Sequence, residues 1–394
     1  MKYDFDQVID RTDSNSYKWQ LGGRDLIPMW IADMDFQAPQ PVIDAIVKRA
    51  RHGVFGYAGP ADTFFDAVIE WHRKRHGWKI QKEWIEFCPG IIPALHLLVR
   101  ALTHPGDRII VQTPVYYPFY WAVEKNGRHI ARNQLVLENG KYKINFNDLE
   151  EKARDSRTKL LILCSPHNPV GRVWTREELS RLGDICMENN VFVISDELHC
   201  DLVFDGYTHV PFADISDEFA WNSVTCTAPS KTFNLAGLQT SSLIIPDPEI
   251  RELYQHRYFN IRPNPFGLVA TEAAYTRGGE WLEQLMAYLA DNLAFLKSFV
   301  KERLPMVDVI EPEGTYLVWM DFRRLGMDPG ELEDLMLNQA GLWLDEGYIF
   351  GSEGAGFERF NIACPRTVLE EGLNRVADAV DQISQRVSHG ISQG

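Results

Sequence analysis

A lysine, an aspartate, an asparagine and a glycine stand in four short segments, and the first three of these residues each follow a predicted strand. Lys231 lies in the segment Ala-Pro-Ser-Lys-Thr-Phe-Asn, and Asp196 comes directly after the apolar run 191–195. Asn168 lies between two prolines, and Gly90 precedes a predicted helix start. Because open α/β sheets bind ligands outside the carboxyl ends of their strands, we expect these four groups to meet at one sheet edge.

Taken singly, each group has an ordinary interpretation. Lys231 would be an exposed loop lysine, Asp196 a turn or helix-capping residue, Asn168 part of a proline-rich turn, and Gly90 a simple helix entry. Together they form the set that pyridoxal 5′-phosphate (PLP) requires. A lysine forms a Schiff base with its aldehyde, a carboxylate keeps its pyridinium nitrogen protonated, and N–H groups at a helix start hold its phosphate.

Other cofactor and catalytic motifs are missing from the sequence. It contains no G-x-G-x-x-G, no P-loop, no G-x-S-x-G and no H-E-x-x-H. His72 and His76 have a spacing that metal ligands use, but they enclose three cations and stop at Gly77. Cations before a glycine are typical of a helix C-terminus, so we expect a capped helix there and predict no metal site.

Charge and composition limit the partners. The 394 residues include 40 Lys plus Arg and 55 Asp plus Glu, which gives a net charge of −15. Such a chain repels nucleic acid and anionic membranes, and the basic run Arg73–Arg75 is too short to change that. We therefore expect a small-molecule substrate and neither a nucleic-acid nor a membrane partner.

The six cysteines form no C-x-x-C pair, which argues against a metal ribbon, a redox motif and a disulfide framework. The first residues, Met-Lys-Tyr-Asp-Phe-Asp, lack the apolar core of a secretory signal. No apolar run approaches the roughly 20 residues that cross a bilayer. A cytoplasmic protein with reduced thiols is expected.

The elements that position the four groups are short apolar strands alternating with amphipathic helices. Such alternation predicts an α/β fold with a mostly parallel sheet between helices. The predicted strands are 108–112, 159–164, 191–195, 223–226 and 241–245, and an amphipathic helix is expected over 176–189.

After residue 280 the pattern changes to a long helix, short strands at 307–310 and 316–321, and a final helix over 367–387. The sequence therefore predicts a large domain over 46–280. A smaller α+β domain is predicted from both chain ends, 1–45 and 281–394.

Several segments resemble one superfamily over nearly the whole chain. S-P-H-N-P-x-G, S-D-E and S-K-T-F-N occur in the order of the fold type I PLP-dependent aminotransferases, followed by N-I-A-C-P-R. The segments 26–36, 54–57 and 195–202 look like the cystathionine β-lyase-type C–S lyases of that superfamily. The resemblance implies PLP as cofactor.

The resemblance also implies roles around the cofactor ring. Lys231 would be the Schiff-base lysine and the base at the substrate Cα. Asp196 would pair with the pyridinium nitrogen, Asn168 would bind the phenolic oxygen, and Tyr116 would stack on the ring. His199 stands where many relatives carry tyrosine; it would bind the phenolic oxygen, or it is only a packed histidine.

For the phosphate, the resemblance implies N–H groups at Gly90 and Ile91 and the hydroxyl of Ser230. Tyr57 would reach the phosphate of a neighbouring subunit, so a homodimer is expected. Gln239 stands where many relatives carry arginine or lysine, which leaves open how the phosphate charge is balanced.

Arg366 would bind the substrate α-carboxylate through a bidentate ion pair. The expected reaction is α,β-elimination of cystathionine or a related S-substituted L-cysteine to a thiol, pyruvate and ammonia. An aminotransferase remains an alternative, because both reactions begin with removal of the Cα proton. A PLP-binding regulatory protein with a protein partner is a further alternative.

Overall fold

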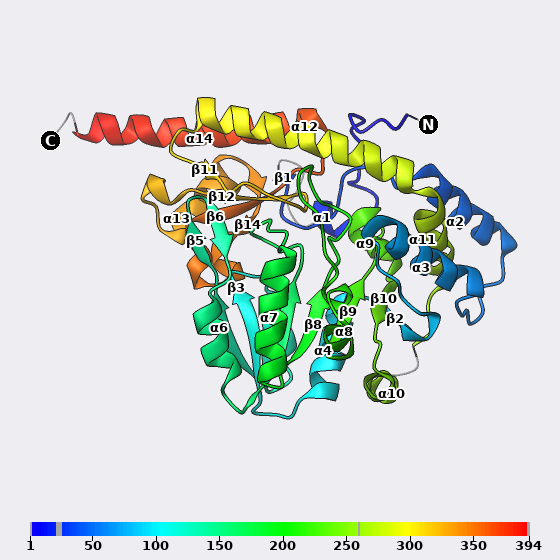
Figure 1. Cartoon of the computed structure of the whole chain (residues 1–394). Coiled ribbons are helices and arrows are strands. Elements are labelled where there is room, and N and C mark those ends of the chain that lie inside the picture. The colour runs from blue at the N-terminus through cyan, green and yellow to red at the C-terminus, as the bar shows by residue number, and fades with distance from the viewer. Residues whose placement is uncertain (1, 21–25, 259–260, 392–394) are drawn as a thin grey trace.

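The centre of the protein is a seven-stranded sheet (Figure 1). The structure, a computed structural model, describes residues 2–20, 26–258 and 261–391, with only the backbone for 384–391. The strand order is β2 (Ile85–Cys88), β10 (Ser241–Ile244), β9 (Ser223–Thr227), β8 (Phe192–Asp196), β7 (Thr158–Cys164), β3 (Arg108–Thr113) and β4 (His129–Gln134). The strands from β9 to β4 run parallel, and β10 is antiparallel to both of its neighbours. The predicted, mostly parallel sheet is confirmed.

Helices cover both faces of this sheet because its strands are apolar on both sides. Ile109 of β3 packs in the core that includes α4 (Ile91–Leu102), whereas the next residue, Ile110, packs in the opposite core with α7 (Arg176–Glu188). The predicted helix over 176–189 is thus confirmed to within one residue. The other helices of this part are α5 (Pro118–Glu124), α6 (Phe146–Ala153), α8 (Asp217–Trp221), α9 (Pro229–Thr232) and α10 (Pro248–Arg257).

A second, antiparallel sheet lies beyond the large one. Its order is β11 (Asp308–Val309), β12 (Leu317–Asp321), β15 (Phe357–Asn361) and β14 (Asp345–Glu346). The long helices α12 (Gly279–Arg303) and α14 (Arg366–Ile391) run beside one another along this part of the molecule (Figure 1). Short elements complete the chain: α1 (Tyr17–Gln20), β5 (Val136–Glu138), β6 (Lys141–Lys143) and α13 (Pro329–Asp334).

The two chain ends meet in this second region. Strand β1 (Ile27–Pro28) pairs in parallel with β13 (Leu342–Trp343). This pairing agrees with a small domain built from both ends, although the division into domains remains a prediction. The expected boundary at residue 46 falls inside α2 (Gln40–His52), which packs as one helix on α11 (Pro265–Arg277).

Helix α3 (Asp62–His76) ends as the sequence predicts. Gly77 follows it with a φ of 71°, the left-handed conformation that favours glycine at a helix end. His72 is only 2% exposed, so it belongs to the interior, whereas the three cations after it are exposed.

The six cysteines all lie in the described part of the chain, where each is buried and none forms a disulfide. Among the described residues, no helix is long and apolar enough to cross a membrane.

Candidate active site

Three of the predicted groups meet at the carboxyl edge of the large sheet. Asp196 ends β8, in register with Cys164 at the end of β7 and with Cys226 near the end of β9. Asn168 follows β7, and Lys231 lies in α9 directly after β9. Because β7, β8 and β9 are parallel neighbours, their ends bring the amide, the carboxylate and the lysine to one place, as the sequence predicted.

Asp196 is buried with little to stabilise its charge. Burial raises the pKa of its carboxyl group to about 7, and the opposing influences are the backbone N–H of Leu198 and the charge of Lys231. The Leu198 N–H donates to Asp196 Oδ1 at 3.2 Å. A carboxylate in this state is ready to accept a charged partner.

Lys231 is directed at a backbone carbonyl. Its Nζ donates to the Ala32 oxygen at 2.6 Å. Burial lowers the pKa of the amine to about 8, with Asp33 and Asp196 raising it and Arg359 lowering it. A substantial fraction of the amine is therefore neutral, and able to act as nucleophile or base, near pH 8.

Asn168 meets an arginine from the second sheet. Arg359 of β15 is 1% exposed, and its Nη1 donates to Asn168 Oδ1 at 3.0 Å. Its Nη2 donates to the Trp30 carbonyl and to the Asp345 carboxylate. The Arg359 Nε is buried and has no partner among the described residues, so this N–H of the guanidinium is left to bind an anion.

Arg366 lies elsewhere, which contradicts the placement predicted for it. Its Nε donates to Asn292 Oδ1 at 2.8 Å, and its guanidinium lies 4.6 Å from the ring centre of Phe295. Both partners belong to α12, so Arg366 holds the start of α14 against that helix. Arg359, seven residues earlier, is the arginine that reaches Asn168.

Tyr116 and His199 lie beside the same groups. The Tyr116 N–H donates to the Asn168 carbonyl at 3.2 Å, and burial raises the pKa of the Tyr116 hydroxyl. Burial, Lys231 and Arg359 lower the pKa of His199 to about 3, which keeps its imidazole neutral. The His199 Nδ1 is buried and has no partner among the described residues, so this ring nitrogen is left to bind a ligand.

Gly90 and Ile91 form the start of α4 as predicted. A Cβ at Gly90 would meet only Pro93 Cδ, at 3.6 Å, so the protein leaves space open beside the helix start. Ser230 lies in the first turn of α9, and Gln239 is exposed in a left-handed turn. The first N–H groups of a helix attract anions, which suits a phosphate at Gly90.

Tyr57 is fully exposed, at 101% of its reference area. Its own chain therefore does not bury the ring, in contrast to Tyr116. A residue that acts across a subunit boundary would be exposed in this way.

The residues present fit PLP. The Asp196 carboxyl is buried without a cation bonded to it. The Arg359 Nε and the His199 Nδ1 are buried donors or acceptors without partners. Together with Lys231 and the open helix start at Gly90, these unsatisfied groups match an anionic ligand that carries an aldehyde and a protonated ring nitrogen.

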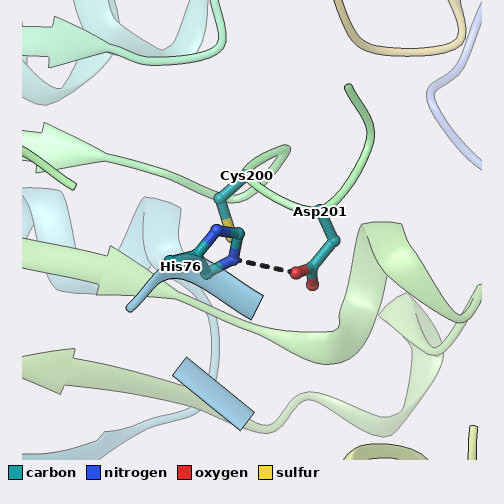
Figure 2. Close-up of side chains that lie close together, drawn as sticks. All are labelled: His76, Cys200 and Asp201. Carbon is teal, nitrogen blue, oxygen red and sulfur yellow. Dashed lines mark hydrogen bonds and ion pairs between the residues drawn. The ribbon is translucent and has the colours of Figure 1, made fainter. Parts of the chain in front are cut away.

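A second cluster of chemically active side chains consists of His76, Cys200 and Asp201, the last of which is five residues after Asp196 (Figure 2). His76, Cys200 and Asp201 place one nitrogen, one sulfur and one oxygen within 4.8 Å of one another. The Asp201 carboxylate accepts hydrogen bonds from His76 at 3.0 Å, from Trp71 at 3.1 Å and from Thr232 at 2.8 Å. Burial and the neighbouring carboxylates raise the pKa of the Cys200 thiol. In the structure this cluster is a satisfied hydrogen-bonded network.

Arg359 and the backbone carbonyls of Trp30 and Ala32 are site groups that were not predicted from the sequence. The signal for Arg359 was present: Phe-Glu-Arg-Phe-Asn is a short strand with a charged pair among aromatic residues, and all five residues are buried. A buried arginine needs a partner, which makes it a candidate for binding an anion. The carbonyls of Trp30 and Ala32 are backbone groups, which every residue type has, so the sequence does not mark them.

Comparison with known proteins places the chain in a family. Residues 24–376 match the family Aminotransferase class I and II. Cystathionine beta-lyase PatB of Bacillus subtilis is 46% identical over 384 residues, which cover 95% of this chain and 99% of PatB.

Two solved structures extend the comparison. Cystalysin from Treponema denticola, which contains PLP, is 39% identical with a TM-score of 0.95, covering 97% of this chain and 100% of cystalysin. The PLP-bound C–S lyase from Staphylococcus hominis is 35% identical with a TM-score of 0.92, covering 96% of this chain and 98% of that lyase. The predicted fold type I of PLP-dependent transferases is thereby confirmed, and the chain belongs to the aminotransferase class I and II family.

Proposed function

We propose that the protein is a PLP-dependent carbon–sulfur β-lyase that acts on L-cystathionine or a related S-substituted L-cysteine. The observation that carries the proposal is the 46% identity to a cystathionine β-lyase over 95% of the chain. The PLP-bound C–S lyase of similar fold supports it. The site residues alone do not distinguish a lyase from an aminotransferase, since both need a lysine, an aspartate and an arginine.

Bound PLP supplies an electron sink for the pair of electrons left when the substrate Cα loses its proton. Asp196 would ionise to hold a proton on the ring nitrogen, because an adjacent cation lowers a carboxyl pKa that burial has raised. Asn168 and the free Nδ1 of His199 would bind the phenolic oxygen. Tyr116 would cover one ring face.

Arg359 would bind the substrate α-carboxylate in place of Arg366. Its Nε has no partner among the described residues, and Asn168 accepts only one of the two N–H groups of Nη1, so each of these atoms keeps one hydrogen for the carboxylate. Asp345 and the Trp30 carbonyl accept from Nη2 and fix the plane of the guanidinium. A planar, charged donor held in this way orients the substrate Cα as well as binding the carboxylate.

Lys231 would take the Cα proton onto its neutral amine. The Cβ–S bond then breaks and the sulfur leaves with the electron pair as a thiolate, which is protonated to the thiol. The three-carbon product is hydrolysed, so cystathionine and water give homocysteine, pyruvate and ammonia. Lys231 returns its proton in the same cycle, and no second substrate is consumed.

The decisive assay is incubation of the PLP-loaded protein with L-cystathionine in the absence of any keto acid. A lyase produces free thiol, pyruvate and ammonia in equal amounts over many turnovers. Lys231→Ala is the matched loss-of-function control, and the exposed Lys48→Ala is the matched neutral one. If no thiol appears in this assay, and a parallel incubation with added keto acids converts them to amino acids, the protein is an aminotransferase and the lyase proposal fails.

We propose further that two copies form a homodimer in which Tyr57 reaches the partner's phosphate site. One segment exposes three large side chains, those of Val54, Phe55 and Tyr57. The ring centres of Phe55 and Phe266 are 5.6 Å apart. A second copy would cover this surface. Its Tyr57 hydroxyl would then bind the phosphate, for which Gln239 provides no positive charge. Sedimentation equilibrium tests the dimer, and Tyr57→Ala should weaken PLP binding while Tyr207→Ala, also exposed, should not.

A further inference from the structure

Five successive carbonyls, from Trp30 to Met34, accept hydrogen bonds from side chains at the active site. We call residues 30–34 the carbonyl strap. The donors are Arg359 to Trp30, Asn361 to Ile31 at 2.8 Å and to Asp33 at 2.6 Å, Lys231 to Ala32 at 2.6 Å, and Asn234 to Met34 at 2.9 Å. The strap therefore joins the segment Lys231–Asn234, which we call the lysine loop, to β15 of the second sheet.

The Ala32 carbonyl at the centre of the strap accepts two donors. Lys231 Nζ lies 2.6 Å from it, and the Tyr316 hydroxyl donates to it at 3.0 Å. A carbonyl oxygen has two lone pairs, so both donors are accommodated. Tyr316 is 1% exposed, and its own carbonyl accepts from the Ile362 N–H at 3.0 Å, which fixes it to the second sheet.

The lysine loop is tied to the strap at a second point. Asn234, three residues after Lys231, donates to the Met34 and Phe36 carbonyls at 2.9 and 3.0 Å and accepts from the Met34 N–H at 3.0 Å. The distance between Lys231 and Ala32 is therefore set by the backbone of both segments. The Tyr316 hydroxyl donates to the same Ala32 carbonyl as Lys231 does, and Tyr316 directly precedes β12, so it links this carbonyl to the second sheet.

We propose that the Ala32 carbonyl is the docking position of the Lys231 amine whenever that amine is not linked to the cofactor, and that Tyr316 is the positioning residue that holds this carbonyl in place. The inference rests on the proposed role of Lys231 as the base at Cα. An amine that donates one hydrogen to a fixed acceptor keeps its lone pair in a fixed direction. The amine would then receive the Cα proton without first searching for its orientation.

The chain contains a matched control for Tyr316. Tyr254 is also 1% exposed, and its hydroxyl also donates to a backbone carbonyl, that of Phe87, at 3.0 Å. Tyr316→Phe and Tyr254→Phe each remove one buried hydroxyl and one hydrogen bond to a carbonyl. The two variants should lower the urea midpoint of unfolding by similar amounts. A difference between their kcat values would therefore result from the contact of Tyr316 with the Ala32 carbonyl.

The kinetic test compares kcat and KM of the two PLP-loaded variants with L-cystathionine. Tyr316→Phe should lower kcat about tenfold or more, because a base that loses its orientation loses rate. KM and the dissociation constant of PLP should change less than about twofold, since Arg359, Asp196 and Gly90 are untouched. Tyr254→Phe should retain wild-type kcat. Wild-type kcat in Tyr316→Phe would overturn the role of Tyr316.

The structural test does not depend on turnover. In crystals of the PLP-loaded wild-type protein soaked with L-alanine, which has no leaving group on Cβ, Lys231 is released from the cofactor. Its Nζ should lie within about 3.2 Å of the Ala32 oxygen. A position beyond hydrogen-bond distance would overturn the docking site. If the lyase assay fails but Nζ docks on Ala32, the proposed function is wrong and the docking inference stands.

Discussion

Asp196 and Asp201 are five residues apart, both are buried, and their pKa values move in opposite directions. Burial raises the pKa of Asp196 to about 7. At Asp201 the same burial penalty is outweighed by the hydrogen bond and charge of His76, the hydrogen bond from Thr232 and the charge of His72, which lower its pKa to about 2. Desolvation acts on both carboxyl groups, so their hydrogen-bonding and charged partners decide the direction of the shift.

Asp196 therefore belongs to a site with unused hydrogen-bonding capacity, whereas Asp201 belongs to a network whose hydrogen bonds are formed within the protein. Asp201 accepts hydrogen bonds from Trp71 and His76 of α3 and from Thr232, the neighbour of Lys231, and so ties the segment that carries Lys231 to α3. Figure 2 shows the contact with His76. Asp196 has one backbone donor. A buried charge without a partner costs stability, and such groups are concentrated at functional sites.

The largest expected effect separates the two carboxylates by activity. Asp196→Asn should lower kcat for elimination about 1,000-fold, because an amide cannot stabilise a protonated ring nitrogen. Asp201→Asn should lower kcat less than about tenfold, since Asp201 acts only through Thr232 and the loop. Both variants are assayed with saturating PLP and L-cystathionine. Equal losses of kcat in the two variants would contradict the assignment of Asp196 to the active site and of Asp201 to a structural network.

Stability should show the reverse order. Asp201→Asn should lower the free energy of unfolding by about 3 kcal/mol, because it weakens a buried, hydrogen-bonded carboxylate. The exposed Asp205→Asn, four residues on, should change it by less than about 0.5 kcal/mol. Urea unfolding of the PLP-free proteins at pH 7 measures both. A loss below about 1 kcal/mol for Asp201→Asn would contradict the structural role.

The unsatisfied charge of Asp196 should appear as a pH-dependent cost. A carboxyl group with a raised folded-state pKa stabilises the fold in its neutral form, and that stability is lost as pH rises from about 4 to about 7. PLP-free Asp196→Asn should therefore be more stable than wild type by about 4 kcal/mol at pH 8, because that is the free energy that separates a pKa of about 7 from the ordinary 3.8. The two proteins should differ little at pH 4. A constant difference at both pH values would show that Asp196 is not the titrating group.

The smallest effect concerns the histidine of the network. His76→Gln keeps a hydrogen-bond donor for Asp201 but removes the option of a positive charge. The free energy of unfolding should fall by about 1 kcal/mol at pH 7. Urea unfolding compares it with the exposed His256→Gln, which should be neutral. A loss as large as that of Asp201→Asn would mean that His76 carries the whole network.

The sequence was sufficient for the groups that follow adjacent parallel strands. Asn168, Asp196 and Lys231 converge because β7, β8 and β9 are neighbours in the sheet. Arg359 lies on a strand of the other sheet, and its approach to Asn168 depends on how the two sheets pack. A local motif does not contain that packing, so the sequence pattern points to Arg366, seven residues away, and not to Arg359.

The remaining features depend on contacts between distant residues. The Ala32 carbonyl meets Lys231 across 199 positions of sequence, and a backbone group leaves no mark in the residue type. His76 was correctly placed at a helix end, but its contact with Asp201 links residues 125 positions apart. Both contacts follow from tertiary packing, whereas the cap at Gly77 is local and was predicted.

The most direct test of the account is to locate the cofactor on the chain. PLP-free protein is titrated with PLP, the absorbance is recorded, and borohydride reduction followed by peptide mass spectrometry identifies the modified lysine. We expect a violet absorbance band, one pyridoxyl group per chain on Lys231, and loss of both in Lys231→Ala. A colourless protein, or a pyridoxyl group on any other lysine, would contradict the assignment of this sheet edge as the active site.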